Sequence, residues 1–186
     1  MRAFPLLLIL LAGPALAQTP GGGLVWEIDA DLDGDGQPER YTLVGGATEG
    51  TVDLSVETPA GLRVAEGIAW TGGMAGQEPT LGLNPAGSVT LTSMNDSVGR
   101  DRWTLTLTIA HREGDWRVAG VTYEFRDTLD LNAYGGCDVN LLTGEGTAWG
   151  PGGEHAVSTG LRAPLLWDWT DRDQWELMPS DCYGEA

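Results

Sequence analysis

The fold class follows from residues 103–125, which read WTLTLTIAHREGDWRVAGVTYEF. Apolar and threonine side chains alternate along the first half of this stretch, which is typical of a strand with one buried and one solvated face. Glu113-Gly114-Asp115 is a turn signal, and Trp116–Phe125 is expected to return as the partner strand. The stretch therefore predicts an antiparallel β-hairpin with a threonine-rich outer face.

Shorter segments on both sides of this hairpin also indicate strands. Alternating apolar positions occur in 24–28, 41–43, 51–57, 62–70 and 88–92, separated by Gly, Asn, Asp and Pro. In 62–70 we expect Leu62, Val64, Ile68 and Trp70 on one face, with a bulge at Glu66-Gly67. The glycine-rich residues 143–160 are expected to hold loops and two short strands. No amphipathic helix and no linker is evident, so the chain is predicted to be all-β, a single antiparallel β domain forming a sandwich or an open barrel.

The N-terminus resembles a cleavable export signal. Residues 1–17 read MRAFPLLLILLAGPALA, with Arg2, a short apolar run and the A-x-A site Ala15-Leu16-Ala17. The apolar run is shorter than the roughly 20 residues of a membrane anchor, which is the competing interpretation. We therefore expect cleavage after Ala17, a flexible leader at 18–23 and one domain at 24–186. The mature chain is expected to be periplasmic or secreted, with no membrane insertion after signal cleavage.

The charge of the chain restricts its partners. It carries 27 acidic residues against 10 arginines and no lysine, for a formal net charge of −17. Such a chain would be repelled by nucleic acid and by anionic membranes. We therefore expect a protein or glycan partner and no nucleic acid.

The two cysteines, Cys137 and Cys182, suit an oxidising compartment. With only one pair, the connectivity is not in question. A disulfide between them would stabilise the fold by about 4 kcal/mol in the chain-entropy model and would tie down the C-terminal segment. The alternative, a redox or nucleophilic thiol, has no C-x-x-C spacing to support it.

A calcium loop is the one motif with a specific chemistry. Residues 31–39 read DLDGDGQPE, with acids at alternate positions of a glycine-containing loop. Calcium prefers about six to eight oxygen ligands, and alternate residues of a curled loop point their side chains inward. The predicted Ca²⁺ ligands are Asp31, Asp33, Asp35, the main-chain carbonyl of Gln37, and Glu39. The ion would be a structural staple, or it would bridge to a ligand; an acidic turn with no ion is the third interpretation.

This loop resembles the calcium loop of FG-GAP repeats, the integrin-type propeller family, and of VCBS-type secreted modules. It is not an EF-hand, because position 12 is Thr42 and the flanking segments are predicted strands. The resemblance implies one Ca²⁺ held by the five residues above, but no propeller, because the loop occurs once. Residues 137–144, CDVNLLTG, also resemble a stretch in uncharacterised secreted bacterial proteins with one such acidic loop, which supports a stand-alone domain and implies no activity.

The C-terminal segment carries a second candidate surface. Trp167, Trp169 and Trp175 alternate with acids, a combination that suits sugars because C–H faces pack on rings while hydroxyls bond carboxylates. The simpler interpretation is that these rings fill the core. No catalytic residue can be assigned. The preferred hypothesis is a non-enzymatic, calcium-stabilised envelope or extracellular interaction protein; the alternatives are a carbohydrate-binding or carbohydrate-cleaving protein, and an inhibitor or immunity-type partner.

Overall fold

The computed structural model describes residues 23–184, which form two antiparallel sheets. The smaller sheet holds β1 (Leu24–Ala30), β2 (Glu39–Gly45), β3 (Thr51–Thr58) and β4 (Gly61–Trp70). The larger sheet holds β5 (Thr80–Leu83), β6 (Val89–Asn95), β7 (Asp101–Arg112), β8 (Asp115–Asp127), β9 (Tyr134–Asn140), β10 (Glu145–Gly150) and β11 (Gly153–Ser158). The all-β class predicted from the sequence is therefore confirmed.

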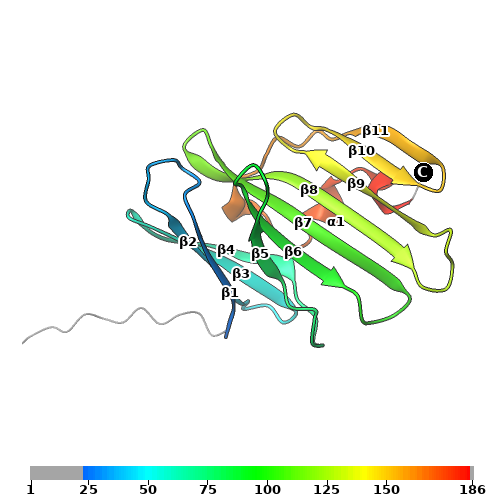
Figure 1. Cartoon of the computed structure of the whole chain (residues 1–186), viewed down its shortest axis with the longest axis horizontal. Coiled ribbons are helices and arrows are strands. Elements are labelled where there is room, and N and C mark those ends of the chain that lie inside the picture. The colour runs from blue at the N-terminus through cyan, green and yellow to red at the C-terminus, as the bar shows by residue number, and fades with distance from the viewer. Residues whose placement is uncertain (1–22, 185–186) are drawn as a thin grey trace, which may run out of the picture.

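Both sheets are meanders, in which each strand pairs with its neighbour in sequence (Figure 1). The order is β1-β2-β3-β4 in one sheet and β11-β10-β9-β8-β7-β6-β5 in the other. This topology follows from the short polar connections, which allow only hairpins between successive strands.

The β7–β8 hairpin forms as the sequence predicts. Its two-residue turn has Glu113 at φ 55° and Gly114 at φ 80°, the left-handed pair that matches the twist of a hairpin. Threonines of β7 face outward, while the apolar residues Leu105, Leu107 and Ile109 are buried on the inner face.

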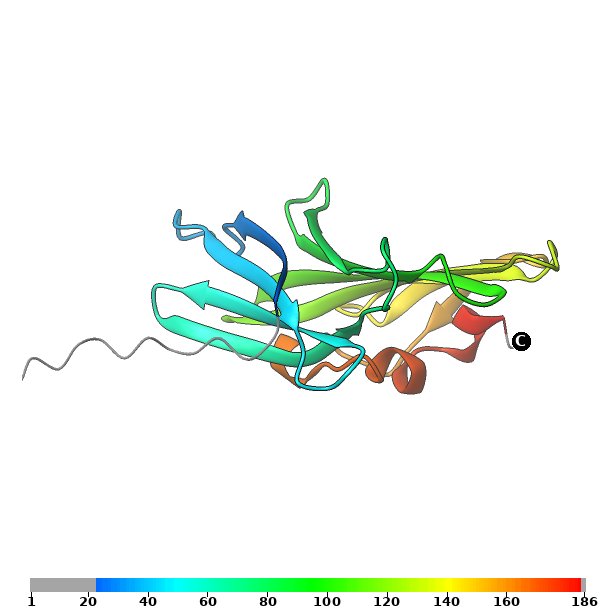
Figure 2. The ribbon, with the colours of Figure 1, turned by 90° about the horizontal axis from the view of Figure 1, so that it is seen from below.

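The inner face of the larger sheet is covered by two different parts of the chain (Figure 2). The smaller sheet packs against one half, and a C-terminal segment made of η1 (Leu166–Asp168), α1 (Asp173–Leu177) and η2 (Ser180–Tyr183) covers the other half. No segment within residues 23–184 covers the outer face. The arrangement is a β-sandwich in which a tail of short helices replaces part of the second sheet.

The disulfide predicted between Cys137 and Cys182 is confirmed. Cys137 lies on the inner face of β9 and Cys182 lies in η2, and both are fully buried. The bond therefore fastens the C-terminal segment to the larger sheet.

The bulge expected in β4 is present, but the predicted face of the strand is wrong on its N-terminal side. The pairing with β3 shifts between Val52 and Leu54, which pair with Ala69 and Ala65. Ala65 pairs with the buried Leu54 and is itself fully buried, so the opposite side of the strand from the predicted one faces the core before the bulge, and Leu62 is 59% exposed.

The expected signal peptide at 1–17 and most of the leader at 18–23 lie outside the described residues. Among residues 23–184, no helix has both the length and the apolar character needed to cross a membrane.

Candidate metal centre

The loop between β1 and β2 is held in shape by its own carboxylates. Asp31 accepts hydrogen bonds from the backbone N–H groups of Gly34 (2.8 Å, Oδ1) and Gly36 (3.0 Å, Oδ2). Asp33 and Asp35 each accept one from the N–H group two residues further on, at 2.9 and 2.7 Å. Both glycines have φ near +80°, at 78° and 87°, a conformation that favours glycine. The loop therefore curls around its acidic side chains.

Three of the predicted ligands meet at one point. Carboxylate oxygens of Asp31, Asp33 and Glu39 lie within 4.8 Å of one another. Asp35 is not part of this group in the described chain. Its carboxylate accepts a hydrogen bond from the backbone N–H of Gln37, and both residues are exposed. The structure thus brings together the two ends of the loop, from the end of β1 and the start of β2.

Glu39 differs from the other acids because it is fully buried. Its Oε2 accepts hydrogen bonds from the backbone N–H of Leu32 (2.9 Å) and from the hydroxyl of Tyr41 (3.1 Å). Its Oε1 is buried and has no hydrogen-bond partner among the described residues. Burial, together with the charges of Asp33 and Asp31, raises the pKa of Glu39 above its ordinary value of 4.5, although the two hydrogen bonds act to lower it.

A chain of buried hydrogen bonds joins Glu39 to the larger sheet. Tyr41 is fully buried, and its hydroxyl accepts a 2.7 Å hydrogen bond from the indole N–H of Trp116 at the start of β8. Because the same hydroxyl donates to Glu39, the acidic loop and the β7–β8 hairpin are connected through two side chains. Both segments lie at the same end of the molecule (Figure 1).

The network continues on the other side of Trp116. The Oδ1 atom of Asp115 accepts hydrogen bonds from Arg63 of β4 (2.9 Å), from the indole N–H of Trp167 (2.9 Å) and from the backbone N–H of Trp116 (2.8 Å). The guanidinium of Arg63 also lies 3.9 Å from the centre of the Trp167 ring, a cation–π contact. Asp115 therefore ties together β4, β8 and η1.

The donor set at the loop fits a hard divalent cation. All three converging groups are carboxylates, and calcium takes oxygen ligands in flexible geometry. A buried carboxylate oxygen without a partner costs free energy, and a bound cation removes that cost. Asp31, Asp33 and Glu39 would hold the ion, and backbone carbonyls and water would complete its shell of about six to eight oxygens.

The chain matches no protein-family model, no curated protein and no solved structure. The resemblance of the 31–39 loop to FG-GAP calcium loops therefore stays a prediction. So does the likeness of residues 137–144 to secreted bacterial proteins.

The three C-terminal tryptophans do not form one exposed surface. Trp169 is 1% exposed and belongs to the core. Trp167 is held between Arg63 and Asp115. Trp175 is 44% exposed, but its ring packs against Tyr183, with centroids 5.1 Å apart. These rings mainly attach the C-terminal segment to the sheets.

A hollow of about 540 Å³ lies beside the β4 bulge, and Asp53 and Asp171 are among the residues that line it. Asp53 is buried and accepts a 2.7 Å hydrogen bond from the backbone N–H of Gly67, while the N–H of Asp171 donates to the carbonyl of Gly67 at 2.8 Å. Burial raises the pKa of Asp171, against hydrogen bonds from Gln174 and the backbone of Trp70. Both hydrogen bonds to Gly67 fix the backbone of the β4 bulge, so the positions of Asp53 and Asp171 have a structural explanation.

Proposed function

We propose that this chain is an exported, calcium-stabilised β domain that acts by binding a partner through its surface. The observation that carries the calcium assignment is Glu39, a fully buried carboxylate with one unpartnered oxygen beside Asp31 and Asp33. Backbone hydrogen bonds explain the positions of Asp31 and Asp33, but none explains the buried Oε1 of Glu39. A cation at this point accounts for all three.

The ion would act as a staple between the two sheets. It would neutralise the charge of Glu39. The other oxygen of Glu39 accepts a hydrogen bond from the Tyr41 hydroxyl, and this hydroxyl accepts a hydrogen bond from the indole N–H of Trp116 in the larger sheet. At about 1 mM free Ca²⁺ and a dissociation constant near 10⁻⁴ M, binding contributes roughly 1.4 kcal/mol to the free energy of unfolding. That is a sizeable share of a stability of about 5–15 kcal/mol.

The disulfide and the proposed calcium site would both be stable in an oxidising compartment that contains millimolar calcium. Disulfides such as Cys137–Cys182 persist in secreted and periplasmic proteins, and extracellular modules bind calcium in the range of about 10⁻⁴–10⁻³ M. These features favour export, together with the signal-like residues 1–17.

The test compares Glu39→Gln with the unmodified protein in EDTA and in 1 mM Ca²⁺. The unmodified protein is expected to melt roughly 3–6 °C higher in Ca²⁺ than in EDTA. In EDTA, Glu39→Gln should be at least as stable, because the amide carries no charge and its oxygen can still accept from Leu32 and Tyr41. In Ca²⁺ the variant should show no increase.

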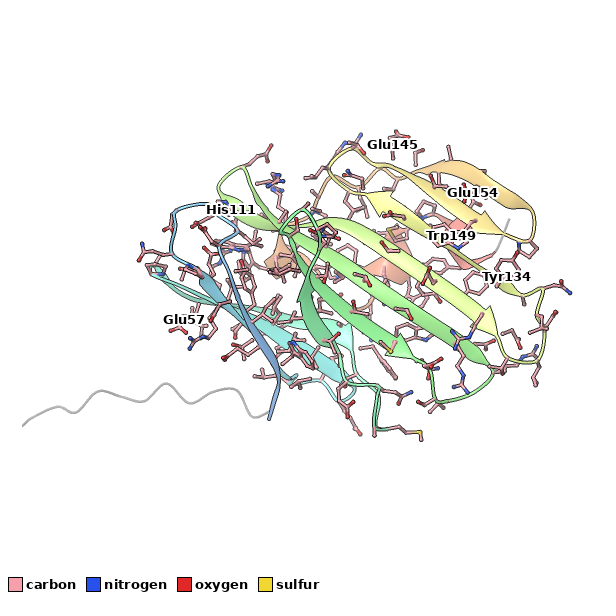
Figure 3. The ribbon with its side chains drawn as sticks, viewed as in Figure 1. Glu57, His111, Tyr134, Glu145, Trp149 and Glu154 are labelled. Atoms are coloured by element: carbon pink, nitrogen blue, oxygen red, sulfur yellow. A yellow bond between two sulfur atoms is a disulfide. The ribbon has the colours of Figure 1, made fainter. Side chains whose placement is uncertain are left out.

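Glu57→Gln is the matched control, because it removes one exposed carboxylate from β3 of the same sheet (Figure 3). It should keep the full response to Ca²⁺. Terbium luminescence sensitised by Tyr41 supplies an independent readout, and Glu39→Gln should abolish it. An equal Ca²⁺ response in Glu39→Gln and in Glu57→Gln would show that any calcium effect arises elsewhere, and the assignment would be wrong.

A further inference from the structure

In the part of the chain that the structure describes, the outer face of the larger sheet is left open, since the smaller sheet and the C-terminal segment both cover the inner face (Figure 2). Threonines occupy much of this face near β6 and β7; Thr92 and Thr106, for example, share a 3.0 Å hydrogen bond. Toward β9, β10 and β11 the surface changes, and aromatic and acidic side chains replace the threonines.

One row of paired residues runs across this part of the sheet, perpendicular to the strands. The pairing register places in order Thr104 of β7, Glu124 of β8, Gly136 of β9, Trp149 of β10 and Glu154 of β11. Neighbouring strands lie about 4.8 Å apart. The ring of Trp149 therefore stands between two exposed carboxylates, one on each side.

Gly136 leaves room for the Trp149 ring to lie against the sheet. A Cβ atom at Gly136 would lie 2.8 Å from Cζ2 of Trp149 and 2.2 Å from the carbonyl oxygen of Tyr123, so no side chain fits there. Gly136 is buried although it belongs to the outer row, because the indole of Trp149 lies against its backbone. The indole is thus supported from below by the sheet.

Tyr134 extends the aromatic surface along the strand. It lies two residues before Gly136 on β9, which makes it a diagonal neighbour of Trp149 at roughly 7–8 Å between Cα atoms. Its side chain is 45% exposed, and Figure 3 shows it on the same face as Trp149 and Glu154. Trp149, Tyr134, Thr104 and Glu124 line a shallow hollow of about 230 Å³, which is smaller than a site for a drug-sized ligand.

We propose that Trp149 and Tyr134, flanked by Glu124 and Glu154, form an aromatic platform that binds a pyranose unit of a neutral glycan. A pyranose has apolar C–H faces that pack on a ring, and hydroxyls around its edge that donate to carboxylates. The row supplies both, with the ring in the middle and a carboxylate at each end. This inference names the partner class for the proposed binding function and does not depend on the calcium site.

The charges of the platform favour a neutral glycan over other partners. Glu124 and Glu154 are exposed, while Arg126 at the border of the hollow is paired with Asp96, so the surface repels acidic polymers. A protein interface usually has a larger apolar centre surrounded by a polar rim, whereas here the aromatic surface consists of two rings, with Glu154 on the strand next to Trp149 and Glu124 two strands away on the other side. Support of a glycine by a cross-strand ring is also a structural device in sheets, so the test must separate binding from stability.

The experiment measures binding of soluble cello-, xylo-, manno- and chitohexaose by calorimetry and by tryptophan fluorescence. At least one hexaose is expected to bind the unmodified protein, and Trp149→Ala should weaken that binding about tenfold or more. Tyr134→Ala should weaken it to a lesser extent; because Tyr134 does not cover Gly136, this variant keeps the test valid if Trp149→Ala fails to fold. The matched control is Trp26→Ala, which removes an exposed tryptophan from β1 of the other sheet and should bind normally.

The same titrations in EDTA separate the two proposals. Binding that survives in EDTA and in Glu39→Gln supports the platform whether or not calcium binds at the loop. The platform is wrong if no hexaose binds, or if Trp149→Ala and Tyr134→Ala both bind as well as Trp26→Ala. Loss of a protein partner in Trp149→Ala, with no hexaose bound by the unmodified protein, would assign the surface to protein recognition and overturn the glycan proposal.

Discussion

The two covers of the larger sheet are attached by different means. The smaller sheet has its own backbone ladders. Its polar contacts with the larger sheet include a buried hydrogen bond, Trp116 to Tyr41, and a partly exposed ion pair, Arg63 to Asp115. The C-terminal segment has only short helices, and among the described residues the one isolated bridge beside it joins Arg117 to Leu165, the residue just before η1. It is held mainly by a disulfide and by aromatic packing, with the hydrogen bond of Trp167 to Asp115 as an additional polar contact.

The difference shows what each kind of cover requires. A four-stranded sheet satisfies its own backbone groups, so it needs only a few specific contacts to fix its position. A segment of about 20 residues without a ladder loses more conformational entropy per contact, and a covalent bond compensates for this by restricting the unfolded chain. We therefore expect the covalent attachment to contribute more to stability than the ionic one.

Removal of the disulfide should have the largest effect. The double variant Cys137→Ala/Cys182→Ala is expected to lose about 4 kcal/mol in the free energy of unfolding and to melt about 10 °C lower. Urea unfolding followed by circular dichroism measures the loss. Limited proteolysis should show cleavage within residues 159–165, before η1, because the segment after this point is no longer fastened to β9.

The comparison predicts that this damage stays on one side of the molecule. EDTA on the disulfide-bonded protein should leave residues 159–165 protected, whereas hydrogen exchange in the β1–β2 loop should accelerate. Equal proteolysis of the C-terminal segment under EDTA and in the double alanine variant would contradict the independence of the two covers.

The second effect concerns Tyr41, which connects the acidic loop to β8. Tyr41→Phe removes the acceptor of the Trp116 N–H and the donor to Glu39, so the free energy of unfolding should fall by about 1–3 kcal/mol. Tyr134→Phe, which removes an exposed hydroxyl, is the control and should change stability by less than about 0.5 kcal/mol. A Tyr41→Phe variant as stable as Tyr134→Phe would show that the buried link contributes nothing.

Local patterns predicted the elements of this fold better than the contacts between them. The alternation in 103–125 gave both strands and the turn, because each residue's face depends only on its neighbours in the strand. The loop at 31–39 was predicted for the same reason; carboxylates of Asp31, Asp33 and Glu39 do converge there, while the calcium ion stays a prediction. The link from Tyr41 to Trp116 spans 75 residues of sequence, and no local signal records that distance.

The tryptophans illustrate the same limit. The acids beside Trp167, Trp169 and Trp175 suggested a ligand surface, yet Trp169 is buried and Trp167 is an internal contact. No local pattern distinguishes Trp149, because its position over Gly136 on the outer face depends on the pairing of β9 with β10. Strand register, which only the fold supplies, decides which ring faces solvent.

The smallest predicted effect tests the polar attachment through pH. Burial acts to raise the pKa of Asp115, but hydrogen bonds from Trp167 and from the backbone N–H of Trp116, with the charge of Arg63, outweigh it and hold the pKa below its ordinary 3.8. A carboxyl whose pKa is lowered by folding stabilises the protein fully above the ordinary value. That contribution is lost as the pH falls below it.

The urea midpoint of the unmodified protein should therefore fall more steeply between about pH 5 and pH 3 than that of Asp115→Asn. The variant keeps an oxygen that can accept hydrogen bonds from Trp167 and Trp116 but lacks the charge that attracts Arg63. It should therefore be less stable than the unmodified protein at pH 5, and the difference in stability should shrink toward pH 3.

Measurements in EDTA remove any contribution from calcium. Asp138→Asn, which removes an exposed carboxylate from the outer face, is the control. If the stability difference between the unmodified protein and Asp115→Asn stays constant across this range, the charge of Asp115 does not help to hold β4 and η1 against β8, and the attachment of the smaller sheet rests on uncharged contacts alone.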